Sequence, residues 1–455
     1  MKFIPPYPKP HESKTSFIKR YFRGRNSWLD VLFKKSYTMK MGHIKQPGLD
    51  VYMVNEPDLI KKVLVDEPSN YPKHSLLHEI LKPLLGNSIF TTNGEVWARQ
   101  RRLVDTGFSQ ARLRLIFPFM MSSINEMLIR LDSHLNCSFE VDAEMTHVTA
   151  DIIFRTILSE KLSEKAAQEI FEAFNDFQRH AQKTLMLKVY HLPTFFADRA
   201  AKRAAHKIRP FISEVIARRY QEKESGSPKE YNDILESVMN AVDPVTHDSF
   251  SYDEMVDQIC MLFLAGHETT ASSLTWSLYL ISKCKDLQLQ MVAEINEVAS
   301  NRVLEFDDIK KLNITTNMFK ESLRLYPPVG IFARESIEDH CMRDKNVKAG
   351  SAVMVSPWLI QRNSDYWENA KTFDPDRFET ESGQAAVKCA YIPFSKGPRV
   401  CTGQAFAMQE AVLILASIVK NYEVSNVASH IPRPVGRVTI RPENGVKVIL
   451  TKRTS

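Results

Sequence analysis

One cysteine lies in the segment Phe394-Ser-Lys-Gly397-Pro-Arg399-Val-Cys401-Thr-Gly403, framed by two glycines and preceded by an arginine. The thiolate, not the thiol, binds metals, and backbone N–H groups and a nearby cation favour that form. Gly397 and Gly403 allow close backbone approach, and a helix that begins near Thr402 directs its N-terminal dipole toward the sulfur. A lone cysteine is more often a small buried hydrophobe. The segment therefore predicts a metal-bound thiolate only if other parts of the chain agree.

The composition of the chain indicates the class of protein. Its 455 residues are 44% hydrophobic and 25% charged, which is typical of a globular protein with a large core. None of the six cysteines stands in a Cys-x-x-Cys pair, so no zinc ribbon or redox dithiol is indicated and a reducing compartment is expected. No segment has the roughly 18–20 consecutive apolar residues of a membrane span, and the N-terminus lacks a signal-peptide core. We expect a cytoplasmic monomer without a transmembrane anchor and without a nucleic-acid partner.

Basic residues are concentrated in the N-terminal segment. Residues 1–46 contain eleven Lys or Arg and two Asp or Glu, a net charge of +9 in a chain whose total is +6. Such a segment is able to contact an anionic membrane or an acidic partner, although a solvated basic segment is commoner. We interpret residues 1–36 as a basic arm. Residues 37–455 are interpreted as one domain, because no linker or shift in composition divides them.

Hydrophobic periodicity predicts a mainly α-helical fold with a minor β part. Apolar residues recur at three- and four-residue spacing over 111–220. Ser251-Tyr-Asp-Glu254 is a capping box at the start of a helix that runs to about Cys284. At about 1.5 Å per residue, this helix spans on the order of 50 Å. Alternating segments predict a hairpin over 37–54 and a second hairpin formed by strands 438–441 and 446–451.

The middle of the long helix reads Leu264-Ala-Gly266-His-Glu268-Thr269-Thr-Ala271. Glycine inside a helix costs about 1 kcal/mol relative to alanine, so Gly266 needs a reason, and close approach of a flat cofactor or small ligand is one. Thr269 beside Glu268 places a hydroxyl and a carboxylate on one turn, an arrangement suited to proton delivery. The alternative is a packing glycine followed by a threonine that hydrogen-bonds its own backbone.

Charged residues at regular spacing provide further candidates. Glu321 and Arg324 are three residues apart on a predicted helix, and Arg377 follows in a proline-containing loop. A pair at this spacing meets on one helix face, where it is usually a surface ion pair of little energetic weight. Trp97 and Arg101, four residues apart, offer an indole N–H and a guanidinium, both suitable donors to a carboxylate.

These motifs, in this order along the chain, resemble those of the cytochrome P-450 superfamily, the haem-thiolate monooxygenases, and in particular its soluble bacterial members. The Phe-x-x-Gly-x-Arg-x-Cys-x-Gly string is similar to the haem-binding loop of that family, and Ala-Gly-His-Glu-Thr-Thr is similar to its oxygen-activation motif. One departure is Thr106, where the family often has proline. The resemblance implies a triangular α-rich domain with small β-sheets. It also implies haem b bound between the long helix and the cysteine loop.

The resemblance also implies roles for individual residues. Cys401 is the expected proximal iron ligand, and Thr269 with Glu268 is expected to guide protons to dioxygen. The other implied roles form three groups. Expected haem contacts are Trp97, Arg101, Ala265, Gly266, Arg334, Phe394, Arg399 and Gly403; the expected structural triad is Glu321, Arg324 and Arg377; expected substrate-pocket residues are Phe263, Leu264, Val329, Ile331 and Phe332.

The implied activity is insertion of one oxygen atom from O2 into an apolar small molecule such as a fatty acid, terpenoid or steroid. The chain has no Gly-x-Gly-x-x-Gly dinucleotide motif and no ferredoxin cysteine spacing. Electrons from NAD(P)H are therefore expected through a separate ferredoxin or flavodoxin with its reductase. Two alternatives stay open, a peroxide-driven haem-thiolate peroxygenase and a non-catalytic haem sensor or carrier.

Overall fold

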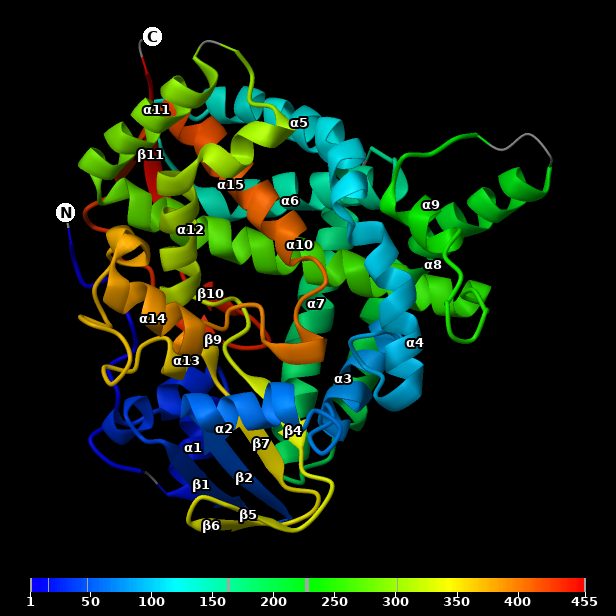
Figure 1. Cartoon of the computed structure of the whole chain (residues 1–455), viewed down its shortest axis with the longest axis vertical. Coiled ribbons are helices and arrows are strands. Elements are labelled where there is room, and N and C mark those ends of the chain that lie inside the picture. Colours follow the sequence, from blue (N-terminus) through cyan, green and yellow to red (C-terminus); the bar gives the residue numbers. More distant parts are fainter. Residues whose placement is uncertain are drawn as a thin grey trace.

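The computed structural model describes residues 2–14, 16–46, 48–161, 164–225, 229–300 and 302–453. Most of the chain is helical, and the helices are arranged around the long helix α10, which runs through the middle of the molecule (Figure 1). The helices are α1 Phe17–Gly24, α2 Pro57–Lys61, α3 Ser75–Leu85, α4 Gly94–Asp105, α5 Gln110–Asp132, α6 Val141–Leu158, α7 Glu164–Val189, α8 Phe195–Glu224, α9 Ile234–Met239, α10 Tyr252–Ser282, α11 Lys285–Ala299, α12 Asn313–Leu325, α13 Pro357–Ile360, α14 Glu381–Ala390 and α15 Gln404–Asn421.

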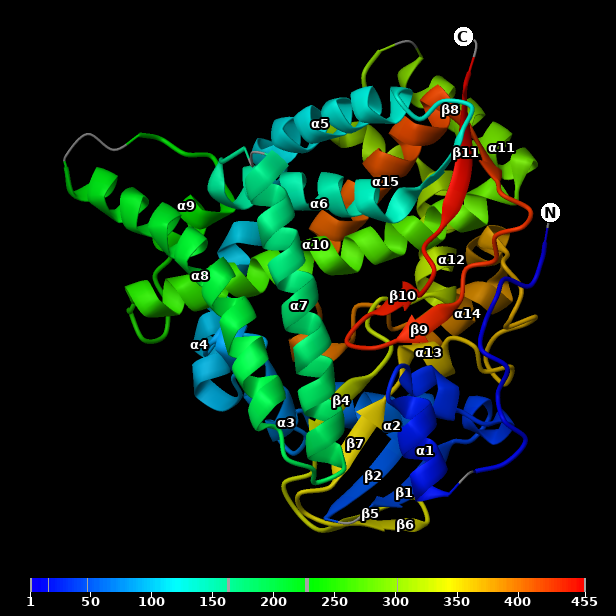
Figure 2. The same cartoon turned by 180° about the vertical axis from the view of Figure 1, so that it is seen from behind.

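In the described part of the chain the strands form four small sheets, of which the largest lies at the opposite end of the molecule from α5 and α11 (Figures 1 and 2). Its strand order is β1-β2-β7-β4, and the other sheets are β3-β11-β8, β10-β9 and β5-β6. The strands are β1 Met41–Gln46, β2 Leu49–Val54, β3 Ser138–Glu140, β4 Phe332–Glu335, β5 His340–Met342, β6 Lys345–Val347, β7 Ala352–Val355, β8 Tyr422–Asn426, β9 Pro434–Gly436, β10 Ile440–Pro442 and β11 Lys447–Lys452.

Helix α10 begins with the predicted capping box. The Ser251 hydroxyl accepts a hydrogen bond from the Glu254 backbone N–H at 3.3 Å, and the Glu254 carboxylate accepts one from the Ser251 N–H at 3.0 Å. The helix is buried along most of its length and packs against α6, α8, α12 and α15. A helix that is covered on all sides belongs to the core of a large domain, so α10 is the framework on which a site between helices is built.

The two predicted hairpins have different outcomes. The first is confirmed, because β1 and β2 pair antiparallel with Met41 opposite Val54. The second is wrong: β10 pairs with β9, whereas β11 pairs with β8 and β3. The Val446 N–H, which follows the intervening turn, donates to the Asp142 carboxylate at 2.7 Å. After this turn the chain therefore runs toward the start of α6, and its next strand, β11, pairs with β3 and β8 instead of β10.

The basic N-terminal segment packs against the rest of the molecule. Backbone N–H of Phe373 donates to the carbonyl of Phe3 at 2.8 Å, and the Tyr326 hydroxyl donates to the carbonyl of Pro6 at 2.6 Å. Leu29 and Leu32 are buried in the main hydrophobic core. The described part of residues 1–36 is thus tied to the body by backbone and core contacts.

Within the described ranges, every helix is too short or too polar to cross a lipid bilayer.

Candidate functional site

The cysteine loop is held by backbone geometry that its sequence requires. Cys401 lies between the 3-10 turn Gly397–Arg399 and α15, and its N–H donates to the carbonyl of Phe394 at 2.9 Å. Gly397 has a φ of +73°, and a Cβ there would lie 2.1 Å from the carbonyl oxygen of Leu64. Only glycine fits that position. The helix itself begins at Gln404, with Gly403 as its N-terminal cap.

Cys401 is an exposed residue, and the protein atoms around its sulfur still remove part of the sulfur's hydration. This burial raises the pKa of the thiol, while a backbone hydrogen bond from Gly403 and the charge of Arg101 lower it, and the pKa remains above its ordinary value. A bound metal ion would add the missing positive charge and deprotonate the sulfur outright. The described residues contain no cluster of three or more His, Cys, Asp or Glu arranged as metal ligands.

The middle of α10 borders accessible space. In a helix that is otherwise buried, Leu264, Ala265, Gly266 and Thr269 retain partial exposure. The chain segment that leads into α15 lies below the middle of α10 in the view of Figure 1. Val329, Ile331 and Phe332, on the connection from α12 into β4, are also partly exposed.

Phe263 belongs to a different face of α10 and does not belong with the predicted pocket residues. Its side chain is buried among the aromatic rings of Phe154, Phe174 and His267, with centroid distances of 4.6, 4.8 and 5.1 Å. Two residues along a helix correspond to about 200°, so Phe263 and Ala265 point in nearly opposite directions. The apolar character of Phe263 reflects core packing against α6 and α7.

Gly266 has a packing reason on one side, whereas its expected role in making room for a cofactor stays a prediction. A Cβ at this position would lie 2.3 Å from Cδ1 and 3.0 Å from Cγ1 of Ile153 on α6. Real Cβ atoms do not approach carbon this closely, because protein interiors are already close-packed. Gly266 therefore allows α6 to contact α10, while Ala265 presents the small side chain on the accessible face.

Thr269 and Glu268, the expected proton-delivery pair, form hydrogen bonds with different residues. The Thr269 hydroxyl donates to the carbonyl of Ala265 at 2.7 Å, a common contact of threonine within helices. The Glu268 carboxylate is buried, pairs with the Arg441 guanidinium (Nε–Oε1 2.6 Å) and accepts from the Thr439 hydroxyl at 2.7 Å. Burial alone would raise the pKa of Glu268, but Arg441 and neighbouring donors outweigh it and hold the pKa below its usual range.

A group of cations lies near the cysteine loop, of which Arg334 is buried and Arg399 and Lys73 are half-buried. Arg334 is 6% exposed, and the Nε atoms of both Arg334 and Arg399 have no hydrogen-bond partner. The Arg399 guanidinium and the Lys73 ammonium lie 5.3 and 5.6 Å from the centroid of the Trp97 ring. Burial and the charges of Arg399, Arg334 and Arg101 lower the pKa of Lys73 to about 6. Among the described residues, no ion pair joins Arg334, Arg399 or Lys73 to an acid. Positive charges held this close together fit an anionic ligand.

Arg101 differs from the other expected haem contacts. Its Nε donates to both carboxylate oxygens of Asp105 at 2.8 Å, and its Nη1 donates to the carbonyl of Val400 at 2.6 Å. Through these contacts Arg101 links the cysteine loop to α4. Its charge acts on the Cys401 thiol and on Lys73 through space.

The residues present fit a haem group. An accessible thiol, an accessible helix face opposite it, and buried arginine nitrogens without partners match a flat macrocycle that carries an iron and two carboxylates. Gly403 fits as well, because a Cβ there would meet only Phe108 at 3.8 Å and would otherwise project into open space.

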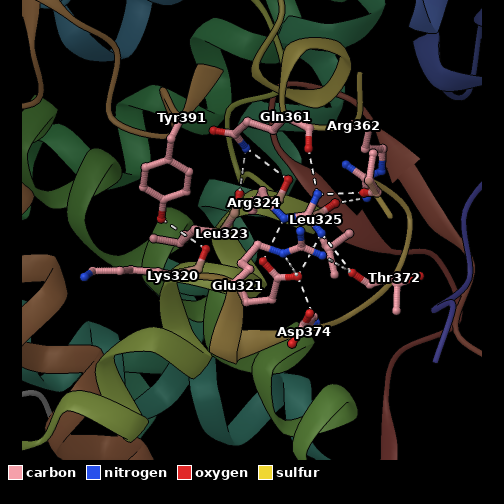
Figure 3. Close-up of polar contacts among 12 residues, drawn as sticks. Lys320, Glu321, Leu323, Arg324, Leu325, Gln361, Arg362, Thr372, Asp374 and Tyr391 are labelled. Carbon is pink, nitrogen blue, oxygen red and sulfur yellow. Dashed lines mark hydrogen bonds and ion pairs between the residues drawn. The ribbon is translucent and has the colours of Figure 1, made fainter. Parts of the chain in front are cut away.

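Glu321, Arg324 and Arg377 form a buried ion-pair cluster. Figure 3 shows Glu321 and Arg324 within it. The Arg324 guanidinium donates to both Glu321 oxygens at 2.7 and 2.8 Å, and Arg377 Nε donates to Oε1 at 3.1 Å. The remaining Arg324 donors bind backbone carbonyls of Gln361, Ala370 and Thr372. Their side chains are at most 5% exposed, so the alternative of a surface ion pair does not apply.

Sequence reasoning missed three residues of this site. Lys73 follows a proline in an ordinary polar stretch. Arg441 lies in β10 and Thr439 directly precedes that strand, far along the chain from Glu268. No local pattern distinguishes these residues from solvated ones. Their involvement depends on which strands pair, and the predicted pairing near residue 440 was wrong.

Comparisons with known proteins agree with this geometry. The family profile described as cytochrome P-450 matches residues 5–449. Cyclooctatin synthase of Streptomyces melanosporofaciens is 29% identical, over 86% of this chain and 83% of that protein. Cytokinin hydroxylase of Arabidopsis thaliana is 29% identical, over 87% and 78%. A crystallised cytochrome P-450 designated CYP102L1 superposes with a TM-score of 0.85 at 21% identity, covering 98% of this chain and 100% of that one.

Proposed function

Because the chain belongs to the cytochrome P-450 family, whose members are haem-thiolate monooxygenases, we propose that it inserts one oxygen atom from O2 into an apolar small molecule. The observation that carries the proposal is the exposed Cys401 near a group of buried and half-buried cations that form no ion pair with an acid among the described residues. The family does not favour the peroxide-driven alternative.

The proposed cofactor contacts follow from these residues. Cys401 is the iron ligand, and the loop from Phe394 to Gly403 surrounds its sulfur. Trp97, Arg334, Arg399 and Lys73 bind the two propionates, which neutralise the cations that the protein alone leaves unpaired. When bound, the haem iron supplies the activation of dioxygen, and its thiolate ligand favours O–O cleavage.

The side chains of α10 supply protons and leave room beside the helix. Ala265 leaves room on the accessible face of the helix. The Thr269 hydroxyl gives up its hydrogen bond to the Ala265 carbonyl and forms one with a donor or acceptor in that room. Glu268 is the acid that replenishes the threonine proton. Leu264, Val329, Ile331 and Phe332 supply partly exposed apolar contacts.

These contacts support an apolar substrate of the fatty acid, terpenoid or steroid kind. The Streptomyces melanosporofaciens relative is a cyclooctatin synthase. Electrons from NAD(P)H arrive through a separate ferredoxin or flavodoxin and its reductase. The absence of a dinucleotide motif in the sequence supports that arrangement.

The test is the spectrum of the reduced CO complex of the purified, haem-loaded protein. We expect the red-shifted Soret band of a thiolate-ligated haem in the wild type and its loss in Cys401→Ala, because only a thiolate donates enough electron density to the iron. Cys389→Ala, at a partly buried cysteine outside the loop, is the matched control and should leave the band unchanged. A retained band in Cys401→Ala would overturn the assignment.

A further inference from the structure

A polar cavity lies where the basic N-terminal segment meets the rest of the molecule, and its lining residues all lie outside the cysteine loop and α10. Its volume is about 380 Å³, and it is lined by Pro8, Lys9, His11, Arg23, Asp30 and Arg433. Three of these side chains are cationic and one is acidic, a net charge of +2 when His11 is neutral. A cavity with such a lining attracts anions.

The one acid in this lining already has a partner. The Asp30 carboxylate accepts a hydrogen bond from Arg433 Nη2 at 2.8 Å, and Arg433 also pairs with Glu443, which lies outside the lining. Among the described residues, no ion pair joins Lys9 or Arg23 to an acid. The cations Lys9 and Arg23 are therefore the ones that remain available to a ligand in the cavity.

His11 and Arg23 make a contact that the protein alone does not satisfy. His11 Nε2 lies 2.9 Å from the carbonyl oxygen of Asp30 and 3.1 Å from Nη1 of Arg23. The carbonyl only accepts a hydrogen bond and the guanidinium only donates one, whereas Nε2 either carries a proton or offers a lone pair. If Nε2 is protonated, two N–H donors face each other, and if it is not, the carbonyl faces a lone pair. One of the two contacts is therefore unfavourable in either tautomer.

The backbone of His11 is fixed, so this conflict is resolved only through side chains. The His11 N–H donates to the carbonyl of Leu32 at 3.0 Å, and the His11 carbonyl accepts from the Lys34 N–H at 2.8 Å. Lys9 and Arg23, in contrast, are exposed and free to turn toward a ligand in the cavity. An anion that accepts from Arg23 would remove the donor that faces His11 Nε2.

We propose that this cavity binds a phosphate group, which Arg23 and Lys9 hold through charge-assisted hydrogen bonds. Arginine pairs with two phosphate oxygens at once, and lysine adds a point charge. A phosphate monoester carries a charge of about −1.5 to −2 at pH 7, which matches the net charge of the lining. With the phosphate on Arg23, the His11 Nε2–H donates to the Asp30 carbonyl, and both groups are satisfied. The site goes beyond the proposed function and does not depend on the haem.

The test is isothermal titration calorimetry of the haem-loaded, full-length protein with inorganic phosphate, at an ionic strength kept constant with sodium chloride. We expect saturable binding, which Arg23→Gln should weaken about tenfold or more, as the loss of a charge-assisted hydrogen bond does. Lys9→Gln should weaken it less, because it removes a charge but no paired contact. The matched control is Arg25→Gln, at an exposed arginine of the same segment outside the lining, and it should bind as wild type does. Equal affinities of wild type and Arg23→Gln, or heat that sodium chloride alone reproduces, would rule the site out.

Nitrogen NMR of protein labelled at its histidine nitrogens locates the bound phosphate, with His11→Gln identifying the His11 signals. Phosphate should shift the Nε2 signal toward the protonated form in wild type and Arg25→Gln but not in Arg23→Gln, and an unchanged signal in wild type would show that phosphate does not reach this cavity. Sedimentation with phosphatidylcholine vesicles that contain phosphatidic acid distinguishes the source of the group. Co-sedimentation that exceeds that of pure phosphatidylcholine vesicles and is lost in Arg23→Gln assigns a lipid headgroup, whereas binding of inorganic phosphate without co-sedimentation assigns a free phosphate compound.

Discussion

At the scale of single residues, Lys73 is a cation whose surroundings are suited to an anionic ligand. Its ammonium donates to the carbonyls of Ile89 and Thr92 at 2.8 and 2.5 Å, so its hydrogen bonds are made. Its charge is nevertheless unfavourable, because burial and the cations Arg399, Arg334 and Arg101 lower its pKa to about 6. Carboxylates brought by a ligand would reverse that penalty.

We therefore predict opposite effects of Lys73→Met on the haem-free and haem-loaded protein. The folded-state pKa of about 6 lies below the usual 10.5, so the unfolded chain binds the extra proton between these pH values. The free energy of unfolding of the haem-free wild type should thus rise as pH increases from about 6 toward 10.5. The variant should lack this component and melt at a higher temperature at pH 7, yet lose haem faster to a haem-accepting protein.

The control for this prediction is Lys61→Met, at a lysine that is 63% exposed and paired with Asp66. It should change neither the pH dependence nor the rate of haem loss. Slower or unchanged haem loss in Lys73→Met would contradict the proposed contact with a propionate.

Thr269 carries a second prediction at this scale. Thr269→Ala removes the hydroxyl that now donates to Ala265 but leaves the helix and the thiolate intact. We expect an unchanged reduced CO spectrum, with most NAD(P)H consumption diverted to peroxide, as measured by the ratio of product to NAD(P)H. Thr269→Ser keeps the hydroxyl and should restore most of the coupling. Unchanged coupling in Thr269→Ala would refute the role of this hydroxyl.

At the scale of secondary-structure elements, the contact between α6 and α10 depends on the missing side chain of Gly266. Gly266→Ala should gain about 1 kcal/mol of helix propensity but force a Cβ to within 2.3 Å of Ile153 Cδ1. Overpacking of a core costs about 1–3 kcal/mol, so we expect net destabilisation in denaturant unfolding. Adding Ile153→Val removes Cδ1 and should recover part of the loss. Strictly additive effects of the two substitutions would contradict the steric explanation.

Elements differ in how far their sequence determines them. The start of α10 was predictable because Ser251 and Glu254 cap it locally, and the cysteine loop was predictable because Gly397 permits one particular turn. The pairing of β10 and β11 was not, since two alternating segments around a turn are compatible both with a hairpin and with strands in separate sheets. That error also concealed Arg441, which lies in β10 and pairs with Glu268.

At the scale of the whole molecule, the cluster of Glu321, Arg324 and Arg377 connects segments far apart in sequence. Arg324 on α12 binds the carbonyls of Gln361, Ala370 and Thr372, and the Asp374 N–H donates to Glu321 at 2.9 Å (Figure 3). Glu321 and Arg324 have no exposed side-chain surface. The chain that precedes the cysteine loop is thus fixed to α12 through one buried carboxylate.

We predict that Arg324→Met lowers the free energy of unfolding by about 3–5 kcal/mol, because it leaves Glu321 ionised and only partly compensated in the core. Arg114→Met is the matched control: its guanidinium makes a similar two-point contact with Asp307, but the two side chains are 56% and 52% exposed. An exposed pair of this kind contributes little to stability, because solvent screens its charges. Denaturant unfolding of the two variants measures the difference, and equal losses would show that burial of the cluster does not determine its contribution.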